Sequence, residues 1–137
     1  MANIHIYKGT VTAGGTNGTQ VSEGTETEPI VIGPLNASSN EESSPVKLAI
    51  RCAAGYVTSG NVTITPTGTS AAKWALAPDS AGSAGAFGAY GAALTIASAI
   101  GDTNTIFWAK AKAVSAEANP VNDTSVNLAV AAVIAAA

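Results

Sequence analysis

The stretch VKLAIRC, residues 46–52, alternates apolar side chains with Lys47, Ala49 and Arg51. An alternation with a period of two places successive side chains on opposite sides of an extended strand, so one face of this segment is buried. Apolar side chains at helical spacing are nearly absent elsewhere in the chain. The stretch therefore predicts a β-strand and sets the pattern for which the rest of the sequence is searched.

Similar short runs occur on both sides of this strand, separated by Gly, Pro, Asn or Asp. Together they predict seven to nine short strands, and such spacing is typical of an all-β sandwich or barrel. The expected strands are residues 4–7 with Val11, 29–34 (PIVIGP), 46–52, 61–65 ended by Pro66, 74–76, 94–96, 105–113 and 126–134.

Two alanine-rich stretches, residues 109–118 and 129–137, allow a competing helical interpretation, because alanine is the best helix former. Pro120 would end the first helix. At the start of the second stretch and just before it, Val126, Leu128 and Val130 occupy alternate positions. The alternation favours strand over helix at both places.

The charge distribution divides the chain into two parts. Residues 1–45 carry five glutamates against Lys8, whereas residues 46–137 carry five basic and four acidic residues. The first part is also rich in Gly, Thr and Ser, and it predicts an acidic N-terminal arm with the first strands, followed by a compact body at 46–137. A single sandwich whose first strands have long connections is the equal alternative.

The composition excludes several classes of protein. Only 11% of the residues are charged, against roughly 25% in an average domain. Six basic residues spread over the chain do not form a phosphate-binding track, and no apolar run is long enough for a membrane span, so neither nucleic acid nor membrane is an expected partner. Met1 to Ile6 lack the pattern of a secretory signal. A thin core without disulfides favours assembly with neighbouring subunits, as a homo-oligomer or symmetric assembly.

Residues for catalysis or metal binding are few. His5 is the one histidine and has no nucleophile signature near it, and Cys52, the one cysteine, closes the buried face of its strand as a core thiol. The segments 102–104 (DTN) and 122–124 (NDT) have oxygen-rich spacing that would suit Ca²⁺, but hairpin turns explain both more simply. We therefore expect no enzyme activity, no cofactor and no metal.

Glycine recurs at every third position from Gly82 to Gly91, in GSA-GAF-GAY-GAA. Without proline this is not a collagen repeat, and it predicts a low-complexity surface loop that carries Phe87 and Tyr90. The two rings either contact a partner or fold back and cap the core.

Trp74 and Trp108 are predicted to lie in the core, because a thin alanine-rich sandwich needs large side chains to fill it. A sugar-stacking role for Trp74, beside Lys73 and near Asp79, is the alternative.

The last predicted strand has no charge to protect it as a sheet edge, and its large side chains include Val133 and Ile134. Either it is central in its own sheet, which is the favoured interpretation, or a partner contacts it through these two residues.

Four segments together resemble the small immunoglobulin-like structural proteins of tailed bacteriophages and prophages. They are IYKGTVTAGGTNGTQVSEGTETEPIVIGPLNAS (6–38), KLAIRCAAGYVTSGNVTITPTG (47–68), DTNTIFWAKAKAV (102–114) and NPVNDTSVNLAVAAVIA (119–135). The resemblance covers most of the chain, in style more than by a diagnostic motif. It implies an immunoglobulin-like antiparallel β-sandwich with an extended N-terminal arm. Such proteins have no catalytic residues to carry over. This sequence departs from the family in its uncharged C-terminus, which argues against a freely exposed terminal strand.

The implied function is that of a virion protein, assembled in the bacterial host cytoplasm, which decorates and stabilises a capsid by contacts with the major capsid protein or other virion subunits. One alternative is a tail tube or filament subunit. Another is an adhesin-like carbohydrate-binding module that uses Phe87, Tyr90, Trp74 and Asp79.

Overall fold

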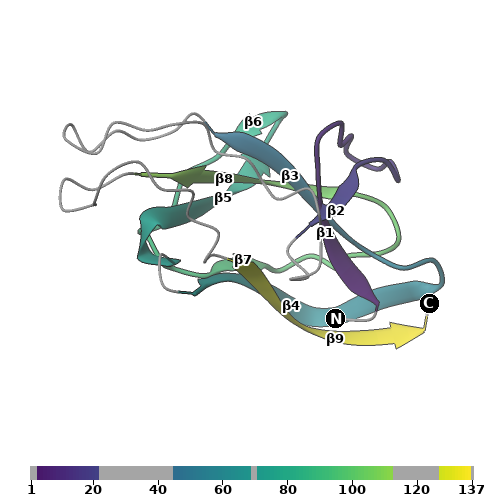
Figure 1. Cartoon of the computed structure of the whole chain (residues 1–137). Coiled ribbons are helices and arrows are strands. Elements are labelled where there is room, and N and C mark those ends of the chain that lie inside the picture. The colour runs from purple at the N-terminus through teal and green to yellow at the C-terminus, as the bar shows by residue number, and fades with distance from the viewer. Residues whose placement is uncertain (1–2, 22–44, 69–70, 113–126, 137) are drawn as a thin grey trace.

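The computed structural model describes residues 3–21, 45–68, 71–112 and 127–136 (Figure 1). A short 3-10 turn, η2 (Ala71–Lys73), precedes the fifth strand. The strands are β1 (Ile4–Lys8), β2 (Thr19–Val21), β3 (Val46–Cys52), β4 (Tyr56–Thr67), β5 (Trp74–Ser80), β6 (Ser83–Ala84), β7 (Leu94–Ile96), β8 (Thr105–Ala111) and β9 (Asn127–Ala136).

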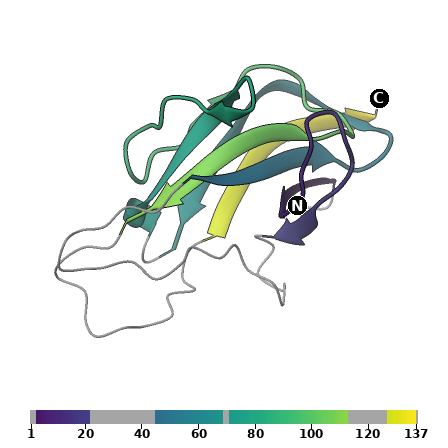
Figure 2. The ribbon, with the colours of Figure 1, turned by 90° about the horizontal axis from the view of Figure 1, so that it is seen from above.

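The strands form two layered sheets. Within each sheet, every described pair of neighbouring strands is antiparallel. One sheet has the order β2-β1-β3-β8-β5-β6, and the other has the order β7-β4-β9. Figure 1 shows the three-stranded sheet below the six-stranded one, and in Figure 2 the long strands of both layers run in broadly the same direction. The predicted antiparallel β-sandwich and its strand count are confirmed.

The strand order corresponds to that of an immunoglobulin sandwich, in which strands A, B, E and D face strands C, F and G. Here β1, β3, β8 and β5 take the places of A, B, E and D, and β4 and β9 take those of C and F. Along the chain, these six strands follow one another in the order A to F. In such a sandwich strand G lies beside F, but no strand of the described residues lies on the outer side of β9.

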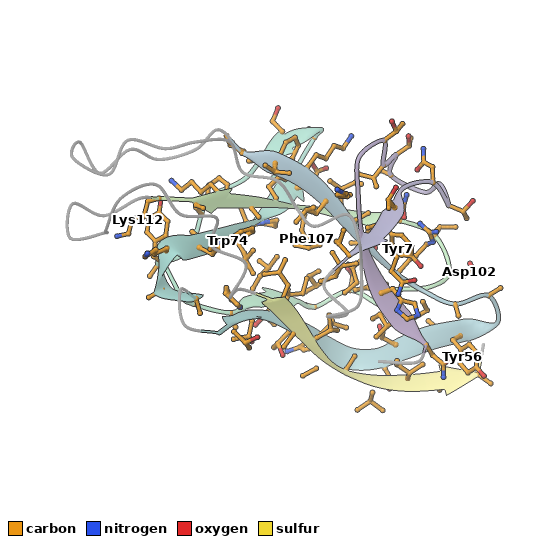
Figure 3. The ribbon with its side chains drawn as sticks, viewed as in Figure 1. Tyr7, Tyr56, Trp74, Asp102, Phe107 and Lys112 are labelled. Carbon is orange, nitrogen blue, oxygen red and sulfur yellow. The ribbon has the colours of Figure 1, made fainter. Side chains whose placement is uncertain are left out.

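The main core lies between the two sheets, because the alternation of each strand sends one set of side chains inward. Phe107 of β8 is completely buried, as are Leu48 and Ile50 of β3 and Val62 and Ile64 of β4. Figure 3 shows Phe107 and Trp74 between the two layers. Residues 46–52 are thus the buried strand that their alternation predicts.

The beginning of the chain belongs to the same sandwich. Strand β1 pairs with β3 from Ile4↔Cys52 to Tyr7↔Ala49, and Ile4, Ile6 and Val21 lie in the main core. Residues 22–44, which make up most of the expected arm and include the expected strand at 29–34, lie outside the described residues.

Two details of the strands differ from the sequence predictions. Strand β4 does not end at Pro66 but continues to Thr67. Because β7 pairs only with Val62 to Ile64, β4 has a neighbour on one side only at Pro66, and a missing N–H group is tolerated there. Trp74 packs against the main core, as predicted, but Trp108 lies on the other face of its sheet, with Val11, Ala49 and Ile106.

The alanine-rich stretches are strands where the structure describes them, in β8 and β9, so the strand interpretation is confirmed there. Residues 113–126 lie outside the described residues.

Cys52 lies in the main core, as predicted, at the end of β3. Its Sγ donates a hydrogen bond of 3.4 Å to the carbonyl of Ile100, and its backbone N–H donates to the carbonyl of Gly101. Burial raises the pKa of the Cys52 thiol, and the nearby carboxylate of Asp102 raises it further. The thiol is therefore held in its unreactive protonated form.

Candidate protein-contact site

The glycine-rich loop, residues 82–91, covers the edge of β5 that faces away from β8. The backbone N–H groups of Gly85, Gly88 and Gly91 donate hydrogen bonds to the carbonyls of Pro78, Leu76 and Trp74, over 2.8, 3.1 and 2.7 Å. One loop triplet therefore spans two residues of the strand, and the three-residue repeat of glycine matches the two-residue repeat of the strand. The repeat thus protects a sheet edge.

Two of these glycines are required by the geometry. A Cβ atom at Gly85 would lie 3.0 Å from the carbonyl oxygen of Pro78, and Gly91 has φ of +86°. At Gly88 a Cβ would meet only the carbonyl oxygen of Leu76, at an ordinary 3.9 Å. The repeat therefore contains positions that require glycine and one that tolerates alanine.

We expect Gly91→Ala to lower the free energy of unfolding by about 1–2 kcal/mol, because an L-residue is strained at that φ. Gly88→Ala is the matched control in the same loop and leaves stability within about 0.5 kcal/mol of the wild type. Urea denaturation followed by tryptophan fluorescence measures both. Equal losses for the two variants would contradict this account of the loop.

Phe87 and Tyr90 lie on the outer face of the six-stranded sheet. The Nζ atom of Lys110 lies 4.8 Å from the ring centroid of Phe87, and that of Lys112 lies 4.4 Å from the centroid of Tyr90. Both rings are half-buried and belong to neither core cluster. They therefore do not cap the core but pack on lysines of the outer face at β8.

Among the residues considered for sugar binding, Trp74 and Asp79 do not come together. Trp74 and Asp79 are five positions apart in one strand, so they point to opposite faces of the sheet. The Oδ1 atom of Asp79 accepts a hydrogen bond of 2.9 Å from Nε1 of Trp108. The geometry therefore offers no shared surface for these two residues.

The outer face of the six-stranded sheet is partly covered by the loop between β1 and β2. Val11 of this loop is buried against Ala49 and Ile106. The Nδ2 atom of Asn104 donates hydrogen bonds to the carbonyls of Thr12 and Asn17 and to the side-chain oxygen of Asn17. These bonds fasten the loop to the sheet.

Arg51 completes this polar cluster. Its Nη1 atom donates to Oδ1 of Asn104 over 2.7 Å and to the carbonyl of Asn17 over 2.9 Å. Its guanidinium carbon lies 3.6 Å from the ring centroid of Tyr7. No buried side-chain nitrogen or oxygen of the described residues lacks a hydrogen-bond partner, so the role of this cluster is to hold the loop in place.

The three-stranded sheet differs from the six-stranded sheet in its chemistry. Strands β4, β7 and β9 contain no Asp, Glu, Lys, Arg or His. One row of its outer face runs across Thr95, Thr63 and Ala131, and neighbouring positions are Thr65, Ser59 and Ala129. This outer face is therefore uncharged, and its side chains at these positions are small. We call it the uncharged face.

Among the described residues, strand β9 forms one edge of that sheet, and they include no further strand that would make it central. In the six-stranded sheet, β8 lies between two strands and the edge of β5 is covered, whereas β9 pairs with β4 alone among the described strands. The strand is ten residues long and carries no charge, proline or glycine to discourage pairing.

The two predicted contact residues of β9 point to opposite sides. Val133 lies on the uncharged face with 67% of its side chain exposed, which makes it the one large apolar side chain that is exposed among the described residues. Ile134 pairs with Thr58 and packs against the main core. Val133 is thus the residue of the pair that is exposed on the surface.

Other chemistry has little support in the part of the chain that the structure describes. No group of three His, Cys, Asp or Glu side chains there is arranged to hold a metal ion. Asn104 of the expected 102–104 turn is buried and its side chain holds the β1–β2 loop, and residues 122–124 lie outside the described residues. Within the described residues, no helix has the length and hydropathy to span a membrane.

Sequence reasoning missed two residues of this architecture, Ile100 and Asn104. Ile100 is completely buried and bonds Thr58 of β4 through its N–H and carbonyl groups. Asn104 follows the loop and bonds residues early in the chain. An apolar residue next to a Gly-Asp turn was the only local signal for Ile100.

Comparisons with protein-family models, with curated proteins and with solved structures found no match.

Proposed function

We propose that this chain is a structural virion protein that decorates and stabilises a bacteriophage capsid by protein–protein contacts, without catalysis. The observation that carries the proposal is the uncharged face together with the long edge of β9, which no strand of the described residues covers. A surface without charge, bordered by an open edge, suits coverage by a neighbouring subunit better than contact with water.

The rest of the molecule supports this proposal by contrast. The edge of β5 is covered by the glycine-rich loop, and the outer face of the six-stranded sheet carries the lysines and the fastened β1–β2 loop. Within the described part of the chain, an edge and the outer face of the six-stranded sheet are thus covered, whereas the outer face and the β9 edge of the three-stranded sheet are not. The partner in this proposal is the major capsid protein or another virion subunit, and weak contacts repeated by capsid symmetry add up to tight attachment through avidity.

The test is binding to expanded shells of the phage whose genome carries this sequence. We expect the purified chain to co-sediment with the shells and to raise their melting temperature. Thr63→Lys places a charge at the centre of the uncharged face, and we expect it to lower the affinity at least about tenfold.

Ser83→Lys is the matched control, because it adds the same charge at an exposed position of the other sheet. It retains wild-type binding. Shells that neither bind the chain nor gain thermal stability would refute the proposal, and so would equal binding by Thr63→Lys and the wild type.

A tail tube or filament subunit is the second candidate, and the open edge of β9 favours it, because an unprotected edge also permits open-ended polymerisation. Negative-stain microscopy of the purified chain distinguishes the two. Spontaneous tubes or filaments support this candidate, and discrete particles that bind shells support capsid decoration.

A further inference from the structure

The sheet edges of the described residues differ greatly in length. Strands β2, β6 and β7 end their sheets with three, two and three residues, whereas β9 ends its sheet with ten. Alternate backbone N–H and C=O groups of an edge strand point away from its neighbour and require another hydrogen-bond partner. From Ala129 to Ala135, β9 therefore presents a continuous row of such groups.

We propose that β9 pairs antiparallel with β9 of a second copy of this chain, about a two-fold axis that crosses the strand. The pairing joins two three-stranded sheets into one six-stranded sheet with the order β7-β4-β9-β9-β4-β7. Each copy donates to and accepts from the same residues of the other, as a two-fold contact requires.

The length of the edge selects a second copy as the occupant. Within the described residues, no other edge is long enough to satisfy the hydrogen-bonding groups of β9 along its length, so the matching strand is another β9. The chemistry agrees, because β9 carries no charge and two copies do not repel each other. Its small alanine side chains also allow two backbones to approach without obstruction.

The alternation of β9 restricts the register of this pair. Side chains that lie opposite each other must share a face, so the exposed residues Ala129, Ala131, Val133 and Ala135 oppose exposed residues of the second copy. With the axis at Val133, this side chain faces its own copy and Ala131 faces Ala135. That register covers the exposed apolar surface of Val133 on both copies and makes the uncharged face continuous across the dimer.

This inference deepens the proposed function, since it names the partner of the β9 edge. Its test uses the isolated chain in solution, so dimerisation can fail while binding to shells holds, and the reverse.

Analytical ultracentrifugation of the full chain over a range of concentrations measures the dimer. We expect a reversible monomer–dimer equilibrium for the wild type, which Val133→Lys weakens at least about tenfold because two lysines then face each other. Thr95→Lys is the matched control, since it adds the same charge on the same face at the opposite edge, and it dimerises like the wild type. Circular dichroism checks that both variants are folded.

A monomer at every concentration up to the millimolar range would overturn the inference. So would a dimer that Val133→Lys leaves intact, or an open polymer in place of a dimer.

A cysteine scan tests the register directly. Single substitutions Ala131→Cys, Val133→Cys and Ala135→Cys are oxidised gently, and the buried Cys52 does not compete. We expect Val133→Cys to form the disulfide-linked dimer fastest, because this residue lies opposite its own copy. Equal rates at the three positions, or none above that of the wild type, would overturn the two-fold pairing.

Discussion

We expect Phe107→Ala to lower the free energy of unfolding by about 3–5 kcal/mol, the range found when a buried phenylalanine is cut back to alanine. Phe107 is completely buried and is the largest of the fully buried side chains among the described residues. Its ring fills the space between the two sheets, opposite the strands of the three-stranded sheet (Figure 3). In a core with few large residues, neighbouring side chains cannot close the cavity, so the loss lies in the upper part of that range.

Chemical denaturation followed by circular dichroism measures this loss. Phe87→Ala is the matched control, because the same atoms are removed from a half-buried ring on the outer face. We expect it to cost less than about 1 kcal/mol, the strength of an exposed cation–π contact. Comparable losses for the two variants would mean that Phe107 is not the centre of the core.

Asn104→Ala is expected to lower the free energy of unfolding by about 2–3 kcal/mol, because it leaves buried groups without partners. The side chain, 4% exposed, accepts from Arg51 and donates to Thr12 and Asn17. Without it, the β1–β2 loop loses the three hydrogen bonds of the Asn104 amide, and a charged hydrogen bond of Arg51 is lost, while the bond from Arg51 to the carbonyl of Asn17 remains. The loss is a large part of the stability of a typical domain.

The same denaturation experiment measures this loss, with Asn61→Ala as the matched control at an exposed position in β4. That variant stays within about 0.5 kcal/mol of the wild type. Hydrogen exchange of the β1–β2 loop supplies a second readout, since Asn104→Ala speeds exchange in residues 9–18 and Asn61→Ala does not. Unchanged exchange in that loop would contradict the role given to Asn104.

The fold class was predictable because it depends on local alternation. The pattern of residues 46–52 sends Leu48 and Ile50 inward, and the structure buries both. The same pattern places Phe107 and Ile106 on opposite faces of β8, as they are found. Alternation tells which side of a strand is buried but not which strand lies beside it.

The contact site was only partly predictable for that reason. The absence of charge after Asn127 indicated an unprotected strand, but whether β9 is central or an edge depends on pairing with β4, about seventy residues earlier. The role of Asn104 was also invisible, since its bonds join residues separated by 87 and 92 positions. The prediction that the strand ends at Pro66 is wrong for the same reason. A proline is tolerated there because β7 pairs with β4 only from Val62 to Ile64, and this pairing is not visible in the local sequence.

The glycine repeat shows the opposite case, in which the pattern was visible and its meaning was not. A three-residue period matches no strand or helix template, and it indicated a surface loop. Its amides in fact protect the edge of β5, and this protection makes the open edge of β9 informative. Within the described residues, the glycine-rich loop covers the edge of β5 and no strand pairs with the outer edge of β9, which is consistent with a partner at β9.

Hydrogen exchange of β9 in the presence and absence of expanded shells tests the central claim most directly. Alternate amides from Ala129 to Ala135 point away from β4, so they exchange quickly in the isolated dilute chain. We predict that these amides become protected when the chain is bound to shells, while exchange in the β5 edge and its glycine-rich loop stays the same. Unchanged exchange in β9 on fully occupied shells would contradict the account.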